Sequence, residues 1–361
     1  MGRWWAVPIA LACACGGTSG NPGDAGDANT LDAVSDVAVD AGDDAGDAGP
    51  LDVGADVAVD AFEPLGPPYP IVLAHGFFGF ETLGLGEWDI TDYFYEVPEH
   101  LETELGESLV YTPAVDPFND SETRGEQLRA EIETILAETG HARVNLIGHS
   151  QGGLDARYVA AVAPEMVASV TTVATPHEGT PLLDVVVAAT DNPFLRGPVN
   201  ELLRLVGGVL WDEVDEDSDL FRALEQLSAD GTAAFNEAYP DSEDVAYFSI
   251  AGRSGLVLAR EQCVPDREVA WIAQWDDERD PVDPLFAVSE SLFDGTFGAP
   301  EPNDGLVRVS SSRHGTFLGC VPADHLDEVG QLFGDRPGTF NDFDYKVMFA
   351  ELTLFLRGEG F

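Results

Sequence analysis

The amino-acid sequence predicts an α/β fold, in which a mostly parallel central sheet is flanked by helices. From Pro64 onward, short apolar runs alternate with segments of helical periodicity, a pattern typical of parallel strands joined by helices. A Gly-x-Ser-x-Gly motif at 148–152 lies between one such run and one such segment. The chain has 361 residues, 44% of them hydrophobic, which is enough to bury the core of one domain of this class.

The first fifteen residues have the pattern of an export signal. Arg3 precedes an apolar run that ends in small residues and cysteine, as secretory signals do, and the run is too short to span a membrane. Residues 9–13, IALAC, also resemble the bacterial lipoprotein motif, with Cys13 as the acceptor and Cys15 as a competing one. We expect export, either as an outer-membrane or cell-surface lipoprotein or as a secreted extracellular protein.

Residues 16–63 are expected to form a disordered acidic tether. From Gly20 to Glu63 the chain consists almost entirely of Asp, Ala, Gly and Val, with twelve acidic residues and no Lys or Arg. Such a composition buries too little apolar surface to fold. The whole chain has a formal net charge of -49, so the rest is acidic too, which argues against a nucleic-acid partner. The folded domain is expected at 64–361.

Its predicted elements follow in chain order. Residues 70–74 are expected to form a buried strand that stops at His75-Gly76, and residues 121–139 a helix that ends at Gly140. The next strand is expected at 143–147, and a helix directly after the motif. We expect that helix to turn four side chains inward: Leu154, Tyr158, Val159 and Val162. Two further strands are expected at 170–175 and 245–251.

Between Pro181 and Asp230 the pattern changes to long amphipathic stretches, with many apolar side chains at 202–211. A helix with that much apolar surface must cover something or be covered. A helical cap or lid is therefore expected at about 181–230.

The motif at 148–152 predicts a nucleophile. A serine on a sharp turn between strand and helix needs flanking glycines, because larger side chains would collide with both elements. Its hydroxyl is then exposed near a helix N-terminus, which favours developing negative charge. We expect Ser150 in this role, with the backbone N–H groups of Gln151 and Phe77 as oxyanion donors.

In this arrangement the acid and then the base follow the nucleophile along the chain. Three histidines remain as candidates for the base: His177, His314 and His325. Spacing alone modestly favours His325 with Asp304.

Many motifs in one order resemble a known family, and they run through most of 69–334: YPIVLAHGFFGF, SETRGEQL, RVNLIGHSQGG, RYVAAVAPE, VATPHEGT, LEQLSADGTAAFNEAYP, NDGLV and HLDEVGQLFG. The chain resembles the Pseudomonas and Burkholderia true lipases, secreted triacylglycerol lipases of the α/β-hydrolase fold. The resemblance implies a catalytic triad of Ser150, Asp304 and His325, with Phe77 and Gln151 forming the oxyanion hole. It also implies that 181–230 is a lid that opens at a lipid surface.

The resemblance further implies a structural calcium that steadies the histidine loop. Its ligands would be the carboxylates of Asp280 and Asp327 and the backbone carbonyls of Gln331 and Asp335, oxygen donors that suit a hard cation. The stretch from Asp280 to Asp304 is longer here than in the family, so Asp283 is an alternative to Asp280.

Outside the signal the sequence has two cysteines, Cys263 and Cys320, and in an oxidising compartment such a pair usually bridges. The family's cysteine shortly after NDGLV is replaced here by Ser310, so the bridge expected from Cys263 to Cys320 is either relocated relative to the family or absent. Need for the family's dedicated folding chaperone is left open.

Two alternatives to a lipase follow from the same residues. The triad would also serve a carboxylesterase, phospholipase or acyltransferase. The second alternative is a non-catalytic surface module with this fold, and the intact triad and oxyanion motifs argue against it.

Overall fold

The computed structural model describes residues 63–76, 93–181, 219–255, 260–278, 280, 286, 293, 295–296, 299–331, 334, 336–338 and 341–361. All of them belong to one compact unit, residues 61–361. The predicted signal and tether, 1–62, lie outside the described residues, as does 182–218 of the predicted lid.

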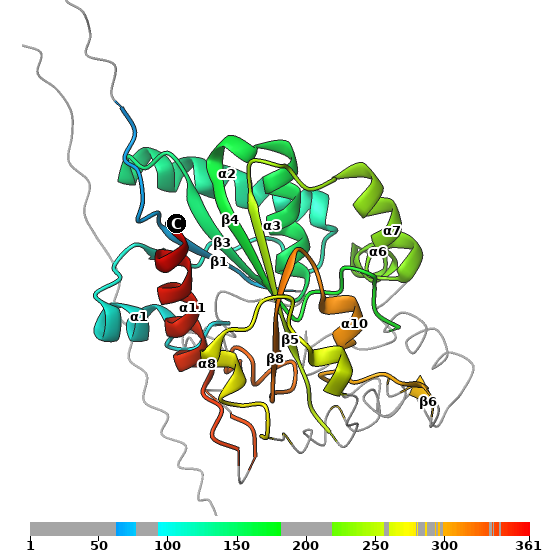
Figure 1. Cartoon of the computed structure of the whole chain (residues 1–361). Helices are drawn as coiled ribbons and strands as arrows, with labels where there is room; N and C mark the ends of the chain where they lie inside the picture. The colour runs from blue at the N-terminus through cyan, green and yellow to red at the C-terminus, as the bar shows by residue number, and fades with distance from the viewer. Residues whose placement is uncertain are drawn as a thin grey trace, which may run out of the picture. The chain divides into compact units, whose positions relative to one another are not determined.

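A six-stranded parallel sheet forms the centre of this unit, in the order β2-β1-β3-β4-β5-β8. Figure 1 shows its strands side by side with helices on both faces. The strands are β1 (Ile71–Ala74), β2 (Val110–Tyr111), β3 (Val144–His149), β4 (Val167–Val173), β5 (Ala246–Gly252) and β8 (Thr316–Val321). A short antiparallel pair, β6 (Gly295–Thr296) and β7 (Ala299–Pro300), lies outside this sheet. The expected α/β class with a mostly parallel sheet is confirmed.

The helices are α1 (Val97–Leu105), α2 (Ser121–Thr139), α3 (Gln151–Val162), α6 (Asp219–Gln226), α7 (Ala229–Ala238), α8 (Ala270–Ala273), α10 (Val309–Ser312) and α11 (Tyr345–Glu359), with single 3-10 turns η1 (Pro164–Met166) and η3 (Arg260–Cys263). The helix expected at 121–139 is confirmed at both ends: the Asp120 side chain accepts the Thr123 N–H, and Gly140 ends it with a left-handed backbone. Among the described residues, no helix is long and apolar enough to cross a membrane.

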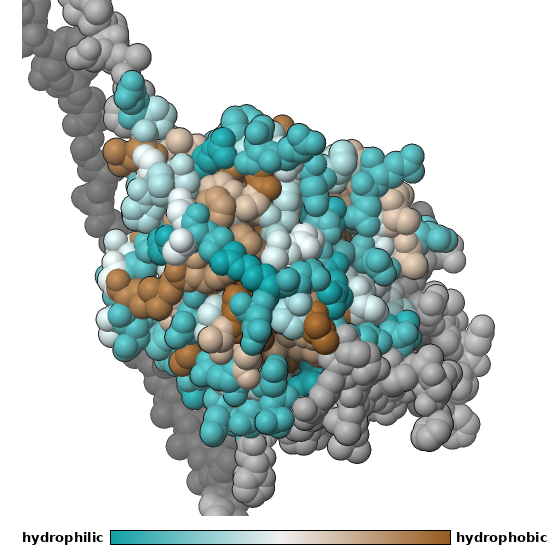
Figure 2. All heavy atoms as spheres, viewed as in Figure 1, coloured by the Kyte–Doolittle hydropathy of each residue, from teal (hydrophilic) through white to brown (hydrophobic). Residues whose placement is uncertain are grey.

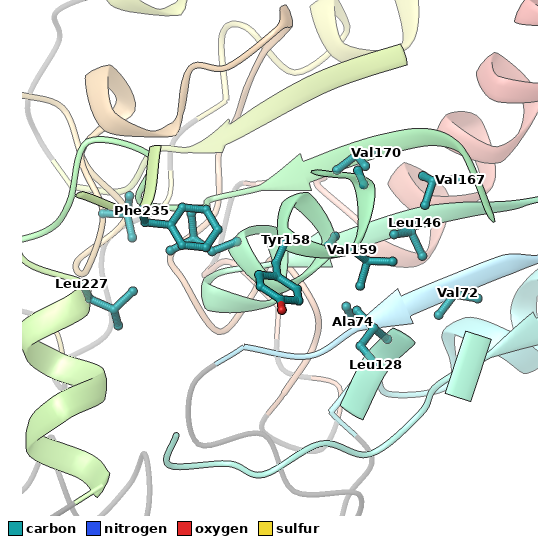
Figure 3. Packing of buried hydrophobic residues seen from close by; sticks show 14 of the residues in the cluster. Val72, Ala74, Leu128, Leu146, Tyr158, Val159, Val167, Val170, Leu227 and Phe235 are labelled. Atoms are coloured by element: carbon teal, nitrogen blue, oxygen red, sulfur yellow. The ribbon is translucent and has the colours of Figure 1, made fainter. Parts of the chain in front are cut away.

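Two apolar cores lie on opposite faces of the sheet because side chains alternate along each strand. Val72 and Ala74 of β1 pack with α2 and α3 in one core, whereas Ile71 and Leu73 pack with α1 and α11 in the other. Figure 3 shows the first core, where Leu128 of α2 and Val159 of α3 meet Val72, Leu146 and Val170 of the strands.

One side chain departs from the expected helix face. Leu154, Tyr158 and Val159 of α3 are buried, but Val162 is 43% exposed. It is the last residue of α3, which ends before Pro164.

On the face seen in Figure 2, hydrophilic side chains predominate among the described residues, and hydrophobic ones lie in separate spots between them. This distribution agrees with the strongly acidic composition of the chain.

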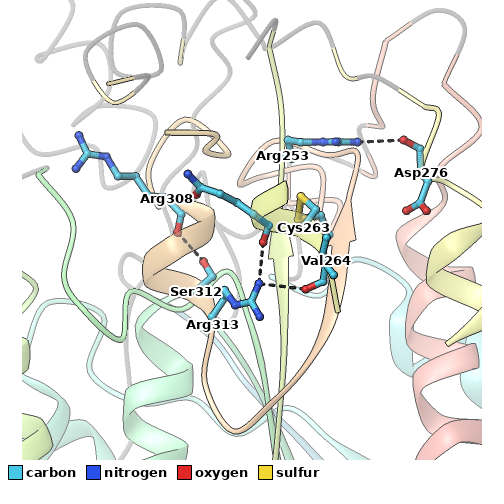
Figure 4. Close-up of a disulfide and its surroundings, with 9 residues drawn as sticks. Arg253, Cys263, Val264, Asp276, Arg308, Ser312 and Arg313 are labelled. Atoms are coloured by element: carbon cyan, nitrogen blue, oxygen red, sulfur yellow. Dashed lines mark hydrogen bonds between the residues drawn. A yellow bond between two sulfur atoms is a disulfide. The ribbon is translucent and has the colours of Figure 1, made fainter. Parts of the chain in front are cut away.

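The bridge expected between Cys263 and Cys320 is present and joins η3 to β8 (Figure 4). It closes a loop with a sequence separation of 57. In the chain-entropy model, reduction should therefore lower the free energy of unfolding by about 4 kcal/mol. Urea unfolding with and without dithiothreitol measures this difference. The variant Cys263→Ser with Cys320→Ser should match the reduced protein, and equal midpoints for the bridged and unbridged forms would contradict the prediction.

Candidate active site

Ser150 occupies a sharp turn between the end of β3 and the start of α3. Its backbone has φ 56 and ψ -131, a positive-φ conformation that costs free energy for a residue with a side chain. The surrounding chain holds the turn: the Ser150 N–H donates to the carbonyl of Val173 over 2.9 Å, and its own carbonyl accepts from the Thr175 hydroxyl over 2.7 Å. The side chain is half-buried.

Gly148 and Gly152, which flank the serine, are required because neighbouring backbone lies too close for a side chain. A Cβ atom on Gly148 would lie 2.5 Å from the Gly152 carbonyl oxygen, and one on Gly152 would lie 2.2 Å from the Ala74 carbonyl oxygen. Both distances are far below van der Waals contact, so only glycine lets β1, β3 and α3 converge at the serine.

Gln151 is the first residue of α3 and is fully buried. The first N–H groups of a helix have no partner within the helix and carry the positive end of its dipole. Phe77, the other expected oxyanion donor, lies outside the described residues. The loop that leads to it starts beside the nucleophile, because a Cβ on Gly76 would lie 2.6 Å from the Ser150 Cβ.

Arg124, which sequence reasoning missed, binds the start of that loop. Its fully buried guanidinium donates to the carbonyls of His75 over 2.6 Å and Asp116 over 2.7 Å, and to the Asp155 carboxylate over 2.8 Å. Burial raises the pKa of Asp155 to about 6 against the opposing effect of Arg124, so above pH 7 the ion pair is formed. Burial, and then Arg124, lower the pKa of His75 to about 4, so this side chain is neutral near pH 7.

Asp304 and His325, far apart in sequence, form a hydrogen-bonded pair. His325 Nδ1 donates to Asp304 Oδ2 over 2.8 Å, and both side chains are buried. The other carboxylate oxygen of Asp304 accepts the backbone N–H groups of Leu306 and Val307 over 2.8 and 2.6 Å. With its proton on Nδ1, the imidazole keeps at Nε2 the lone pair that a general base needs.

His325 also lies next to the serine turn. Its ring centroid is 4.6 Å from that of His149, the residue that directly precedes Ser150. The last link of the expected triad, from His325 to the Ser150 hydroxyl, stays a prediction.

The two other candidate bases contact each other and different partners. The rings of His177 and His314 stack with centroids 4.4 Å apart. His177 contacts Arg157 and Thr172, and His314 pairs with Asp241 over 2.8 Å. Burial lowers the pKa of His177 well below its usual value. These contacts favour His325 as the base.

Two of the expected calcium ligands lie together. The carboxylates of Asp280 and Asp327 approach each other with that of Asp324, and one oxygen from each lies within 4.8 Å of the others. All three side chains are buried, and mutually repelling buried charges of this kind suit a bound cation. Asp324 was missed by the sequence analysis. Gln331 lies five residues beyond Leu326 and donates its N–H to the Leu326 carbonyl, whereas Asp335 and the alternative Asp283 lie outside the described residues.

The ends of the predicted lid segment lie side by side. Thr180 donates its N–H to the carbonyl of Leu227 over 2.8 Å, and its hydroxyl bonds to the carbonyl of Leu306, two residues after Asp304. The residues between, 182–218, are not described, so the lid itself stays a prediction.

The parallel sheet with a serine at the β3–α3 turn defines the class of protein. The alpha/beta hydrolase fold family matches residues 69–248. Triacylglycerol lipases are similar over most of the chain. The one from Vibrio cholerae is 36% identical over 74% of this chain and 81% of its own length. The lipase from Burkholderia plantarii is 32% identical over 76% of this chain and 82% of its own length. The lipase from Pseudomonas fragi is 33% identical over 73% of this chain and 88% of its own length. The chain therefore belongs to the triacylglycerol lipase family of α/β hydrolases, and it is an enzyme.

Proposed function

We propose that this enzyme is a serine lipase that hydrolyses the ester bonds of triacylglycerols and other long-chain acyl esters. The observation that carries the proposal is the buried 2.8 Å hydrogen bond between His325 and Asp304 beside the strained turn of Ser150. Membership of the lipase family supports the substrate class.

In the proposed mechanism, His325 Nε2 takes the proton of the Ser150 hydroxyl as the oxygen attacks the ester carbonyl. Asp304 orients the ring and stabilises the imidazolium that forms. The N–H groups of Gln151 and Phe77 hold the oxyanion. His325 then gives the proton to the leaving alcohol, and a water activated by the same nitrogen releases the fatty acid from the acyl-enzyme.

Hydrolysis of esters of graded chain length tests the substrate class. A lipase should hydrolyse long-chain triglyceride emulsions faster than soluble short-chain esters. The reverse preference would indicate a carboxylesterase, and preferential release of acyl chains from phospholipids or transfer to an alcohol would indicate a phospholipase or acyltransferase. Absence of all these activities would leave the non-catalytic surface module.

We also propose that calcium binds at the buried carboxylates of Asp280 and Asp327, with the carbonyls of Gln331 and Asp335. The clustering of Asp280, Asp324 and Asp327 supports an oxygen-rich cation site. Asp327 is two residues from His325, so a bound cation would hold the loop that carries the base.

Removal of calcium should destabilise the protein. At calcium concentrations about a hundredfold above the Kd, the bound ion adds about 3 kcal/mol to the free energy of unfolding, and a chelator removes this contribution. The melting temperature with calcium and with EGTA measures it. Asp327→Asn should lose the response, whereas Glu165→Gln, which changes an exposed acid elsewhere, should keep it. An unchanged melting temperature in EGTA would contradict the site.

We further infer export, with Cys13 or Cys15 as the lipid-anchored residue or with free secretion, and residues 16–63 as the tether. The signal-like apolar run and the acidic composition support this. A dedicated lipase chaperone is a further candidate partner, suggested by the resemblance alone.

A further inference from the structure

His149 directly precedes the candidate nucleophile, yet its side chain belongs to a different set of contacts. It is the last residue of β3 and is completely buried. Ser150 follows it in the turn, outside the strand. The proposed mechanism gives it no task.

Both ring nitrogens of His149 have partners on separate segments. Nδ1 lies 2.6 Å from the Tyr93 hydroxyl, and Nε2 lies 2.9 Å from Glu328 Oε2. One arrangement satisfies both ring nitrogens: the Tyr93 hydroxyl donates to Nδ1, and the Nε2 hydrogen is donated to Glu328 Oε2. Tyr93 and Glu328 are themselves buried, so neither can exchange this bond for water without cost.

Glu328 lies on the same loop as His325, three residues further on. Its N–H donates to the Asp324 carbonyl, so the loop folds back on itself between the two. The carboxylate occupies the space above Gly252, where a Cβ atom would lie 1.5 Å from Glu328 Oε1 and 2.9 Å from the Asp304 Cβ. The glycine at the end of β5 thus makes room for Glu328 beside the Asp304–His325 pair.

We propose that His149 is a positioning residue, whose hydrogen bond to Glu328 joins the loop of His325 to the end of β3, directly before Ser150. The distance between Ser150 and His325 would then be fixed by a hydrogen bond that lies outside the triad. Tyr93 orients the imidazole at its other nitrogen. The inference rests on the proposed function, since it assigns Ser150 and His325 the roles given above.

Two substitutions of His149 distinguish the role of its Nε2 hydrogen bond from that of its Nδ1 hydrogen bond. In His149→Gln the amide nitrogen takes the place of Nε2 and can still donate to Glu328, whereas in His149→Asn the shorter side chain reaches only the Tyr93 side. We expect His149→Asn to lose about a hundredfold in kcat, the cost of a small misplacement of catalytic groups, with KM for a soluble ester unchanged. His149→Gln should recover most of this loss. Rates are counted per folded molecule, with the folded fraction taken from circular dichroism, so that unfolded protein does not contribute.

His177→Asn is the matched control, because His177 is equally buried and also has two polar partners. It should lower the melting temperature and leave kcat per folded molecule unchanged. Equal kcat for His149→Asn and His149→Gln, or an equal loss in His177→Asn, would overturn the proposal. If His149→Asn does not fold, Glu328→Ala decides, since it removes the acceptor of the Nε2 bond: a lower kcat at unchanged KM supports the inference, and wild-type kcat overturns it.

Ser150→Ala separates this inference from the proposed function. If Ser150→Ala is inactive and the His149 variants behave alike, only the positioning role fails. If Ser150→Ala keeps its activity, the proposed function itself fails.

Discussion

Replacing Ser150 by alanine should lower kcat/KM by about 10⁴- to 10⁶-fold, because removal of the nucleophile leaves only binding and oxyanion stabilisation. His325→Ala should have an effect of the same order, and the two losses should not add, since the residues act as one unit. The measurement is ester hydrolysis by the purified variants at saturating and limiting substrate.

Ser249→Ala is the control for this prediction. Ser249 is also a buried serine at the sheet, where its hydroxyl donates to the His314 carbonyl over 2.7 Å. Its loss should cost stability and leave kcat near the wild-type value. Activity of Ser150→Ala within tenfold of wild type would remove Ser150 from the mechanism.

The second large effect is expected at Arg124. Replacing it by methionine removes the partner of the buried Asp155 carboxylate and the donors to the carbonyls of His75 and Asp116. Breaking a buried ion pair from one side costs about 3–5 kcal/mol, since the remaining charge is left without compensation. Urea unfolding at pH 8, where Asp155 is ionised, measures this loss.

Arg129 on the same helix provides the comparison. It pairs with Glu126 and Glu133 on the surface, where ion pairs are screened by water and salt. Arg129→Met should leave the unfolding midpoint almost unchanged. A midpoint for Arg124→Met as high as that of Arg129→Met would contradict the view that Arg124 clamps the loop before Phe77.

Much of the fold follows from local patterns. The strand at 71–74 and the helix at 121–139 were predicted because periodicity and the helix-ending Gly140 act within a few residues. The same holds for the serine turn, whose glycines are required by the approach of neighbouring backbone.

Features that depend on contacts between distant segments are harder to predict from the sequence. The strand β8 and the helix α11 were not predicted, although α11 carries a buried apolar face and an Asp344 cap. Pairing of Asp304 with His325 rested mainly on family resemblance, since spacing favoured it only modestly. Arg124, Asp324 and the contacts of His149 were missed, because a polar residue's burial depends on segments distant in sequence.

The most direct test of the central claim is the site of covalent labelling by a fluorophosphonate, located by mass spectrometry of the digested protein. The reagent should modify Ser150 alone in the wild-type enzyme, because only a serine activated by a neighbouring base attacks it quickly. Labelling should almost vanish in His325→Ala. Modification of another residue, or labelling of Ser150 at the wild-type rate without His325, would contradict the proposed triad.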